Sequence, residues 1–229
     1  MNIPDAVRRL DHDLREVFGE RVKSVVAYDS PAGAHAALAI ITRLGADDLR
    51  ACAARLAGWH ELGLATPLLV SEDEFDRSLD AFPFEFGAIL AAHVVVSGAD
   101  PFAGLRVDPS DLRRASEVQA RSHLLHLREG YLETYGRSDA VADLIVRSAP
   151  ALAALVTSVA RLHGAVVEGP AAAARVIEQT AALPRNSLTA VVTLSGPEPL
   201  TSERARELFP AYLQGIEQLT RYIDRWSPA

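Results

Sequence analysis

The chain has 229 residues, of which 49% are hydrophobic and 23% charged, and its formal net charge at pH 7 is −7. This composition is typical of a water-soluble globular protein with one large domain or two small ones. The negative charge argues against nucleic acid or an anionic membrane as a partner. The longest apolar stretch, Gly87–Ala99, is too short to predict a membrane span. The only cysteine, Cys52, excludes an internal disulfide, and with a charged N-terminus unlike a signal peptide it predicts a cytoplasmic protein.

The first half of the chain alternates helix and strand signals. A first helix is predicted from Pro4 to Gly19, because apolar residues recur between them at three- and four-residue spacing. Short apolar runs predict strands at Val22–Tyr28 and Ala36–Thr42. The further predicted elements are a helix at Asp47–Leu62, a strand at Thr66–Val70, a helix start at Ser71–Phe75, a helix from about Phe84 to Ala92 and a strand at His93–Ser97. This alternation predicts a small sheet domain of the α/β or α+β class over residues 1–106.

From Asp108 onward the strand signals almost vanish. Helices are predicted at Ser110–Tyr135, at Ser138–His163 with a kink or split at Pro150, at Pro170–Leu183 and at Thr201–Trp226, while Asn186–Leu194 fits either a short helix or a strand. The last helix carries a seven-residue apolar pattern formed by Ala205, Leu208, Tyr212, Ile216, Leu219, Ile223 and Trp226. Such a pattern is typical of the seam of a helix bundle, so residues 107–229 are predicted to form an all-α bundle domain.

Two stretches carry a family resemblance. The segments SVVAYDSPAGAHAALAIITR (residues 24–43) and AAHVVVSGADPFAGL (residues 91–105), followed by an all-helical tail, resemble the polymerase-β-like nucleotidyltransferases. In particular, the chain resembles the small bacterial members that carry a helical bundle behind the catalytic domain. It implies a small mixed-sheet α+β domain at residues 1–106, with a short helix between the first two strands, and a helical bundle at residues 107–229.

Active members of this family have a Gly-Ser pair after the first strand, an Asp-x-Asp pair on the next strand and a third acid on a later one. The acids hold two Mg²⁺ ions, which activate the attacking oxygen and neutralise the leaving pyrophosphate. This chain keeps Ser30, but Asp29 stands in the glycine position and Pro31 removes an N–H that would face phosphate. The stretches LAIITR and LATPLLV, where the acids are expected, contain none. The resemblance therefore implies a scaffold without its catalytic residues and without a metal site or cofactor; Mg²⁺ is expected only if relocated acids form a transferase site.

The Asp29–Pro31 stretch has two interpretations. It is either a simple helix cap or a retained ligand-facing turn, which we expect to line a cleft between the two domains together with the polar face of the helix at Arg121–Glu133. The predicted ligand-binding residues are Asp29, Ser30, Arg121, His123, Glu129 and Glu133.

The segment ARSHLLHLREGYLE (residues 120–133) is the most polar constellation of the second half. Arg121 and His126 have the Arg-then-four-then-His spacing that resembles the HEPN family of helical ribonucleases, in which they would act on RNA phosphate as charge stabiliser and acid–base group. Alternatively, His123 and His126 make half a metal site with Glu129, or the segment is a partly solvated helix face without chemistry.

The sequence thus predicts a non-catalytic binding or regulatory module, whose partner is a small ligand or another protein. Two alternatives stay open. One is an active enzyme, either a nucleotidyltransferase with relocated acids or a ribonuclease that uses Arg121 and His126. The other is a structural homodimer, in which the seam of the bundle is buried against a second copy.

Overall fold

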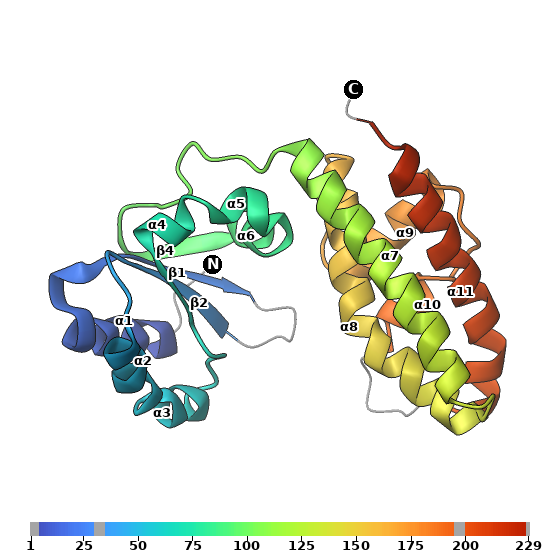
Figure 1. Cartoon of the computed structure of the whole chain (residues 1–229), viewed down its shortest axis with the longest axis horizontal. Coiled ribbons are helices and arrows are strands. Elements are labelled where there is room, and N and C mark those ends of the chain that lie inside the picture. Colours follow the sequence, from blue (N-terminus) through green and yellow to red (C-terminus); the bar gives the residue numbers. More distant parts are fainter. Residues whose placement is uncertain (1–4, 30–34, 195–199, 228–229) are drawn as a thin grey trace. The chain divides into compact units, whose positions relative to one another are not determined.

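The structure, a computed structural model, describes residues 5–29, 35–194 and 200–227. The chain forms two compact units, Met1–Val107 and Asp108–Ala229, which we call unit 1 and unit 2 (Figure 1). Unit 1 combines a small mixed sheet with helices, whereas the regular elements described in unit 2 are all helices. The predicted α+β organisation followed by an all-α part is therefore confirmed.

Unit 1 begins with a helix that leads into the sheet. α1 (Asp5–Phe18) buries its apolar face and is followed by the 3-10 turn η1 (Gly19–Arg21), where Gly19 has a φ of 59° that favours glycine. The strands are β1 (Val22–Asp29), β2 (His35–Ile41), β3 (Leu68–Ser71) and β4 (His93–Gly98). The other helices of unit 1 are α2 (Ala46–Ala53), α3 (Leu56–Glu61), α4 (Glu72–Phe75), α5 (Ser78–Ala81) and α6 (Pro83–Ala91).

The four strands form one sheet in the order β3-β2-β1-β4. β1 is antiparallel to β2 and to β4, whereas β2 is parallel to β3, so the sheet is mixed. β1 and β2 are the two inner strands. Each of these two strands is therefore hydrogen-bonded to a neighbouring strand on both sides.

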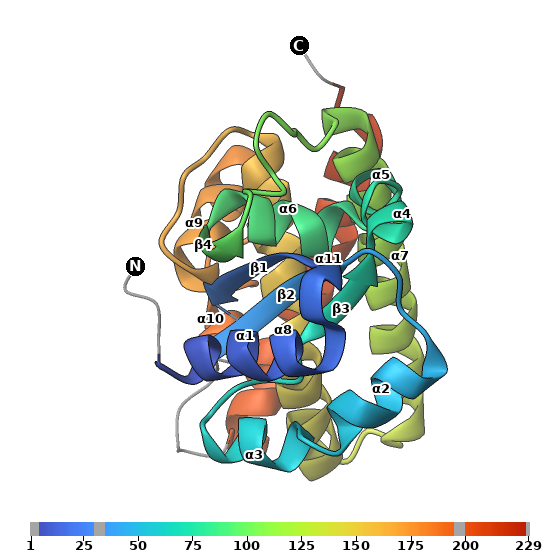
Figure 2. The same ribbon diagram turned by 90° about the vertical axis from the view of Figure 1, so that its left-hand side faces the viewer.

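Helices cover both faces of this sheet, with α1 and α2 on one side and α4, α5 and α6 on the other (Figures 1 and 2). On the α1 face, the sheet contributes Val25, Ala27, Ala37, Ala39 and Ile41 to the core. On the α6 face, it contributes Val26, Leu38, Ile40 and Val70, which pack with Phe75, Phe86, Ile89 and Phe102. Because alternate residues of a strand point to opposite faces, β2 is enclosed from both sides.

The single helix predicted at Asp47–Leu62 is in fact two helices, α2 and α3. The backbone N–H of Arg55 donates to the carbonyl of Cys52, three residues back, at 2.9 Å, so the chain tightens at this point. The turn directs Trp59 into the core beside α1, where its Nε1 donates to a carboxylate oxygen of Asp13 at 2.9 Å. We attribute the break to the burial of this ring and of its hydrogen bond.

Unit 2 contains α7 (Pro109–Glu133), α8 (Ser138–Leu162), α9 (Pro170–Thr180), α10 (Thr189–Val192) and α11 (Ser202–Arg225). α7, α8 and α11 pack against one another, and α9 and α10 pack on α8. The ambiguous segment Asn186–Leu194 contains α10, so the helical interpretation is confirmed. α8 continues through Pro150, so a split at this residue is wrong, whereas a kink stays a prediction. Residues on both sides of the proline, such as Ile145 and Leu152, are fully buried, and this packing holds the two halves of the helix together.

The seven-residue pattern of α11 faces the interior of unit 2 itself. Its buried members are Ala205, Leu208, Tyr212, Ile216, Leu219 and Ile223. This seam is therefore not available to a second copy, which corrects the form of homodimer expected from the sequence. Trp226, the last expected member, lies beyond the end of the helix with φ −70° and ψ 136°, and it is only half-buried.

Among the described residues, one helix is long and apolar enough to cross a membrane by length and composition alone. This helix is α8, a longer apolar segment than the one identified from the sequence. Ten of its residues, Ile145 and Leu152 among them, are buried against the other helices of unit 2. A core helix of a water-soluble bundle meets the same criteria, so the observation is weak evidence for a membrane span.

Candidate functional site

The turn that was expected to face phosphate connects β1 and β2. Asp29 ends β1 and pairs with His35 at the start of β2. Ser30 and Pro31, and the short helix predicted between the strands, lie outside the described residues, as does the side chain of Asp29. The ligand-facing role of Asp29 and Ser30 stays a prediction.

β2 is the strand on which the family's paired carboxylates would lie. Its residues from Ala36 to Ile41 are at most 4% exposed. None of them is acidic, and among the described residues of β1, β3 and β4 the only acid is Asp29. Nowhere in residues 5–29, 35–194 and 200–227 do three His, Cys, Asp or Glu side chains gather closely enough to hold a metal ion.

The α6 face of β2 is closed by an aromatic cluster. The ring of Phe75 packs edge-on against Phe86 and Phe102, with ring centroids 5.7 Å and 5.3 Å apart. Phe102 comes from the loop after β4, and its backbone N–H donates to the Asp100 carboxylate at 2.9 Å. These rings fill the space where a substrate would have to approach β2 on this face.

His93 fixes the same loop. Its Nδ1 is 3.0 Å from the carbonyl of Ile89, and its Nε2 is 3.0 Å from the Asp100 carboxylate. The hydrogen bond from the backbone of Phe102, followed by the contact with His93, lowers the pKa of Asp100. Both ring nitrogens of His93 are thus occupied, and the histidine positions the loop that carries Phe102.

The predicted catalytic pair of α7 is not brought together. Arg121 forms ion pairs with Asp224 of α11 at 2.9 Å and with Glu117 at 3.1 Å, and these carboxylates raise its pKa. The side chain of His126 is 76% exposed and lies 3.6 Å from Glu129. Residues five positions apart on a helix point about 140° apart. Arg121 therefore links two helices while His126 points into solvent.

The other predicted ligand residues of α7 also face different ways. Glu129 and Glu133 are exposed, whereas His123 points into unit 2. No described contact joins His123 to Glu129, so the predicted half metal site is not assembled by these side chains. Whether Arg121, His123, Glu129 and Glu133 bind a ligand stays a prediction.

His123 belongs to a buried polar network that the sequence did not indicate. Its Nε2 is 2.5 Å from the hydroxyl of Tyr212 on α11, which is also 2.9 Å from the hydroxyl of Ser148 on α8. Burial, with a smaller effect of nearby His126, lowers the pKa of His123 from 6.5 to about 4. Burial also raises the pKa of Tyr212. Both side chains are therefore neutral at pH 7, and the network joins the three main helices of unit 2 without buried charge.

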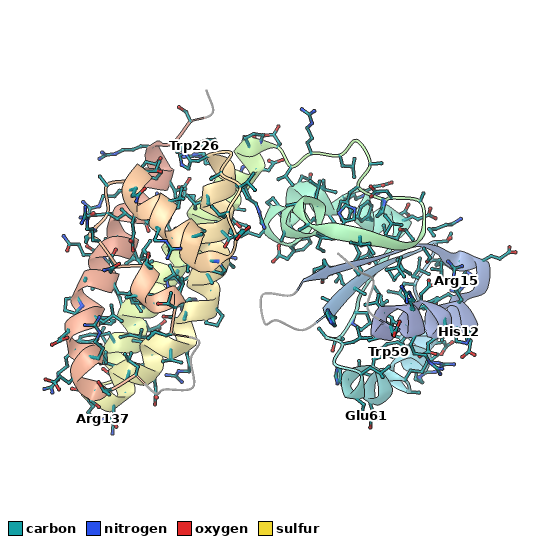
Figure 3. The ribbon with its side chains drawn as sticks, turned by 180° about the vertical axis from the view of Figure 1, so that it is seen from behind. His12, Arg15, Trp59, Glu61, Arg137 and Trp226 are labelled. Carbon is teal, nitrogen blue, oxygen red and sulfur yellow. The ribbon has the colours of Figure 1, made fainter. Side chains whose placement is uncertain are left out.

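A groove of about 690 Å³ runs between α1 and α3 of unit 1. Figure 3 labels His12 and Arg15 on α1 and Trp59 and Glu61 on α3; Trp59 and Glu61 line the groove, whereas His12 and Arg15 do not. Most of its charges are already paired. Asp13 accepts hydrogen bonds from Trp59 and from Arg9, with Nε of Arg9 at 3.0 Å. Most charged groups of the groove thus have partners within unit 1 and are not arranged to bind a ligand.

Comparison of the chain with models of known protein families and with curated proteins finds no match. The resemblance to nucleotidyltransferases stays a prediction from the sequence.

Proposed function

We propose that the protein is a non-catalytic binding or regulatory module, whose unit 1 is a nucleotidyltransferase-like scaffold without its catalytic motifs. The order of elements in unit 1, with two adjacent antiparallel strands followed by a strand parallel to the second, supports this scaffold. The observation that carries the non-catalytic assignment is the burial of β2 on both faces.

A two-metal site needs carboxylates on the same side of a strand and an open space in front of them. Alternate positions of β2 provide two possible pairs. Ala39 and Ile41 face the α1 core, and Leu38 and Ile40 face the aromatic cluster of Phe75, Phe86 and Phe102. Neither pair leaves room for solvated metal ions. Both observations on β2, the missing acids and the filled space, support the non-catalytic assignment.

Calorimetric titration of ATP and GTP, with millimolar Mg²⁺ and with EDTA, tests this proposal. We expect no gain in affinity with Mg²⁺, because no described group of β2 can bind the metal. An affinity that appears only with Mg²⁺, or transfer of a labelled nucleotide to an acceptor, would refute the non-catalytic assignment.

A homodimer is a second candidate, because α7 leaves an apolar stripe in solvent. Val118, Leu125 and Leu132 are 63%, 62% and 75% exposed, and they recur every seven residues. That spacing is typical of a helix that pairs with another helix. Light scattering of wild-type protein and of Leu125→Glu tests this candidate: a dimer that becomes monomeric supports it, and a monomeric wild type excludes it.

A further inference from the structure

Unit 2 has a pocket at the C-terminal end of α11. Its volume is about 640 Å³, within the usual range of small-molecule sites. Its main lining residues are Gln218, Arg221, Tyr222, Arg225 and Trp226. Two guanidinium groups and two aromatic rings thus share one pocket, and none of its lining residues is acidic.

The two aromatic side chains of this pocket both contact His163, which follows the end of α8. The hydroxyl of Tyr222 is 3.0 Å from Nε2 of His163. The His163 ring also meets the Trp226 ring edge-on, with centroids 6.0 Å apart. Because Trp226 has left the helical path, its ring lies at the pocket and outside the buried seam. The two rings are therefore positioned before any ligand arrives, which lowers the entropic cost of binding.

The arginines of the pocket are not needed as hydrogen-bond donors to the backbone carbonyl groups at the end of α11. Arg113 of α7 performs that task, because its side chain donates to the carbonyl oxygens of Trp226 and Asp224 at 3.0 Å and 2.9 Å. Within the described part of the chain, Arg225 makes no hydrogen bond or ion pair. Its guanidinium group is available to a ligand.

Among the described residues, Arg221 makes polar contacts only with Glu217, one turn earlier on the same helix, and its Nε donates to the Glu217 backbone carbonyl at 3.3 Å. Its Nη2 lies 3.8 Å from the Glu217 carboxylate, whereas Arg128 approaches the other oxygen of that carboxylate to 2.6 Å. The closer partner of Glu217 is therefore Arg128. To turn toward an anion in the pocket, Arg221 gives up one exposed hydrogen bond to the backbone and a long ion pair, both of which are weak because its side chain is 65% exposed.

Arginine binds phosphate and carboxylate groups through two parallel hydrogen bonds, and indole and phenol rings bind planar rings by stacking. We propose that this pocket binds a nucleotide, or another planar aromatic anion of that size, with Arg221 and Arg225 on the anion and Trp226 on the ring. No metal is required. The site lies in unit 2 and does not depend on the scaffold proposed for unit 1.

Trp226 provides a direct readout. AMP, ADP and ATP are titrated in EDTA while tryptophan emission is followed, with calorimetry as a second measurement. The other tryptophan, Trp59, is 2% exposed in unit 1 and is expected to keep a constant signal. We expect saturable quenching that is lost in Trp226→Phe. Arg221→Ala and Arg225→Ala should each weaken binding about tenfold or more.

Arg206→Ala is the matched control, because Arg206 is an exposed arginine of the same helix that does not line the pocket. It should bind nucleotides like the wild type. Adenosine and pyrophosphate, the two halves of the ligand, should each bind more weakly than ADP. The proposal is overturned by absence of saturable binding at millimolar nucleotide, by an equal loss in Arg206→Ala, or by either half binding as tightly as ADP. Binding that requires Mg²⁺ and survives both pocket substitutions would contradict this inference and the non-catalytic assignment of unit 1 together.

Discussion

Acidification is expected to destabilise unit 2 through one side chain, His123. Its folded-state pKa is lowered from 6.5 to about 4, mainly by burial. As the pH falls below 6.5, the unfolded chain takes up a proton at this position, but the folded protein does not do so until about pH 4. Proton uptake therefore favours the unfolded state. The contribution of neutral His123 to the free energy of unfolding is fully present above pH 6.5. It is lost as the pH falls from 6.5 to 4, and the loss is at most about 3 kcal/mol.

The measurement compares the wild type with His123→Gln, which cannot titrate at this position. Urea unfolding, followed by the helical circular dichroism signal at several pH values, gives the free energy of unfolding of each protein. Hydrogen exchange of peptides from α7, α8 and α11 assigns the loss to unit 2. We expect the free energy of unfolding to depend less on pH in His123→Gln than in the wild type. In His126→Gln, which replaces an exposed histidine, its pH dependence should be nearly that of the wild type. An equal pH dependence in wild type and His123→Gln would refute the reasoning.

Further substitutions test other parts of the structure. Ala39→Asp combined with Ile41→Asp should unfold unit 1 and give no Mg²⁺-dependent rise in melting temperature, because both positions are fully buried in the α1 core; Ala53→Asp, on an exposed position, is the control. Trp59→Phe should lower the free energy of unfolding by about 1–3 kcal/mol in urea unfolding, because it removes the indole N–H from the buried carboxylate that accepts it. His126→Ala should change stability by less than about 0.5 kcal/mol and leave RNA cleavage assays unaffected; a ribonuclease activity lost in this variant would support the enzyme alternative.

The elements of unit 1 could be predicted well where the apolar pattern alone determines them. The strand predicted at Val22–Tyr28 is β1, and the strand predicted at Ala36–Thr42 is β2 displaced by one residue. The helix predicted from about Phe84 to Ala92 is α6. The division at Ala54–Arg55 could not be predicted, because it depends on the burial of a ring against α1, a contact between residues 46 positions apart. Local patterns carry no information on such a contact.

The buried network of unit 2 shows the same limit for individual side chains. The sequence singles out His123 for its spacing to His126 and Glu129, but its hydrogen-bond partner Tyr212 lies 89 residues away on α11 and is itself bonded to Ser148 on α8. From sequence, Tyr212 was one member of an apolar seam, and Ser148 carried no signal. His123, a predicted ligand residue, thus takes part in the packing of unit 2.

The distribution of charge predicts how salt affects nucleotide binding in unit 2 and in unit 1. Residues 1–106 contain 16 acidic and 10 basic side chains, whereas residues 107–229 contain 14 and 13, so almost all of the net negative charge lies in unit 1. An anion that approaches the exposed acids of unit 1 is repelled, and salt weakens this repulsion. At the pocket of Arg221 and Arg225 the attraction is local, and salt weakens the attraction. Nucleotide binding in unit 2 should therefore decrease as ionic strength rises, whereas binding at unit 1 without metal should increase. The sign of the salt dependence thus distinguishes the two locations without any substitution.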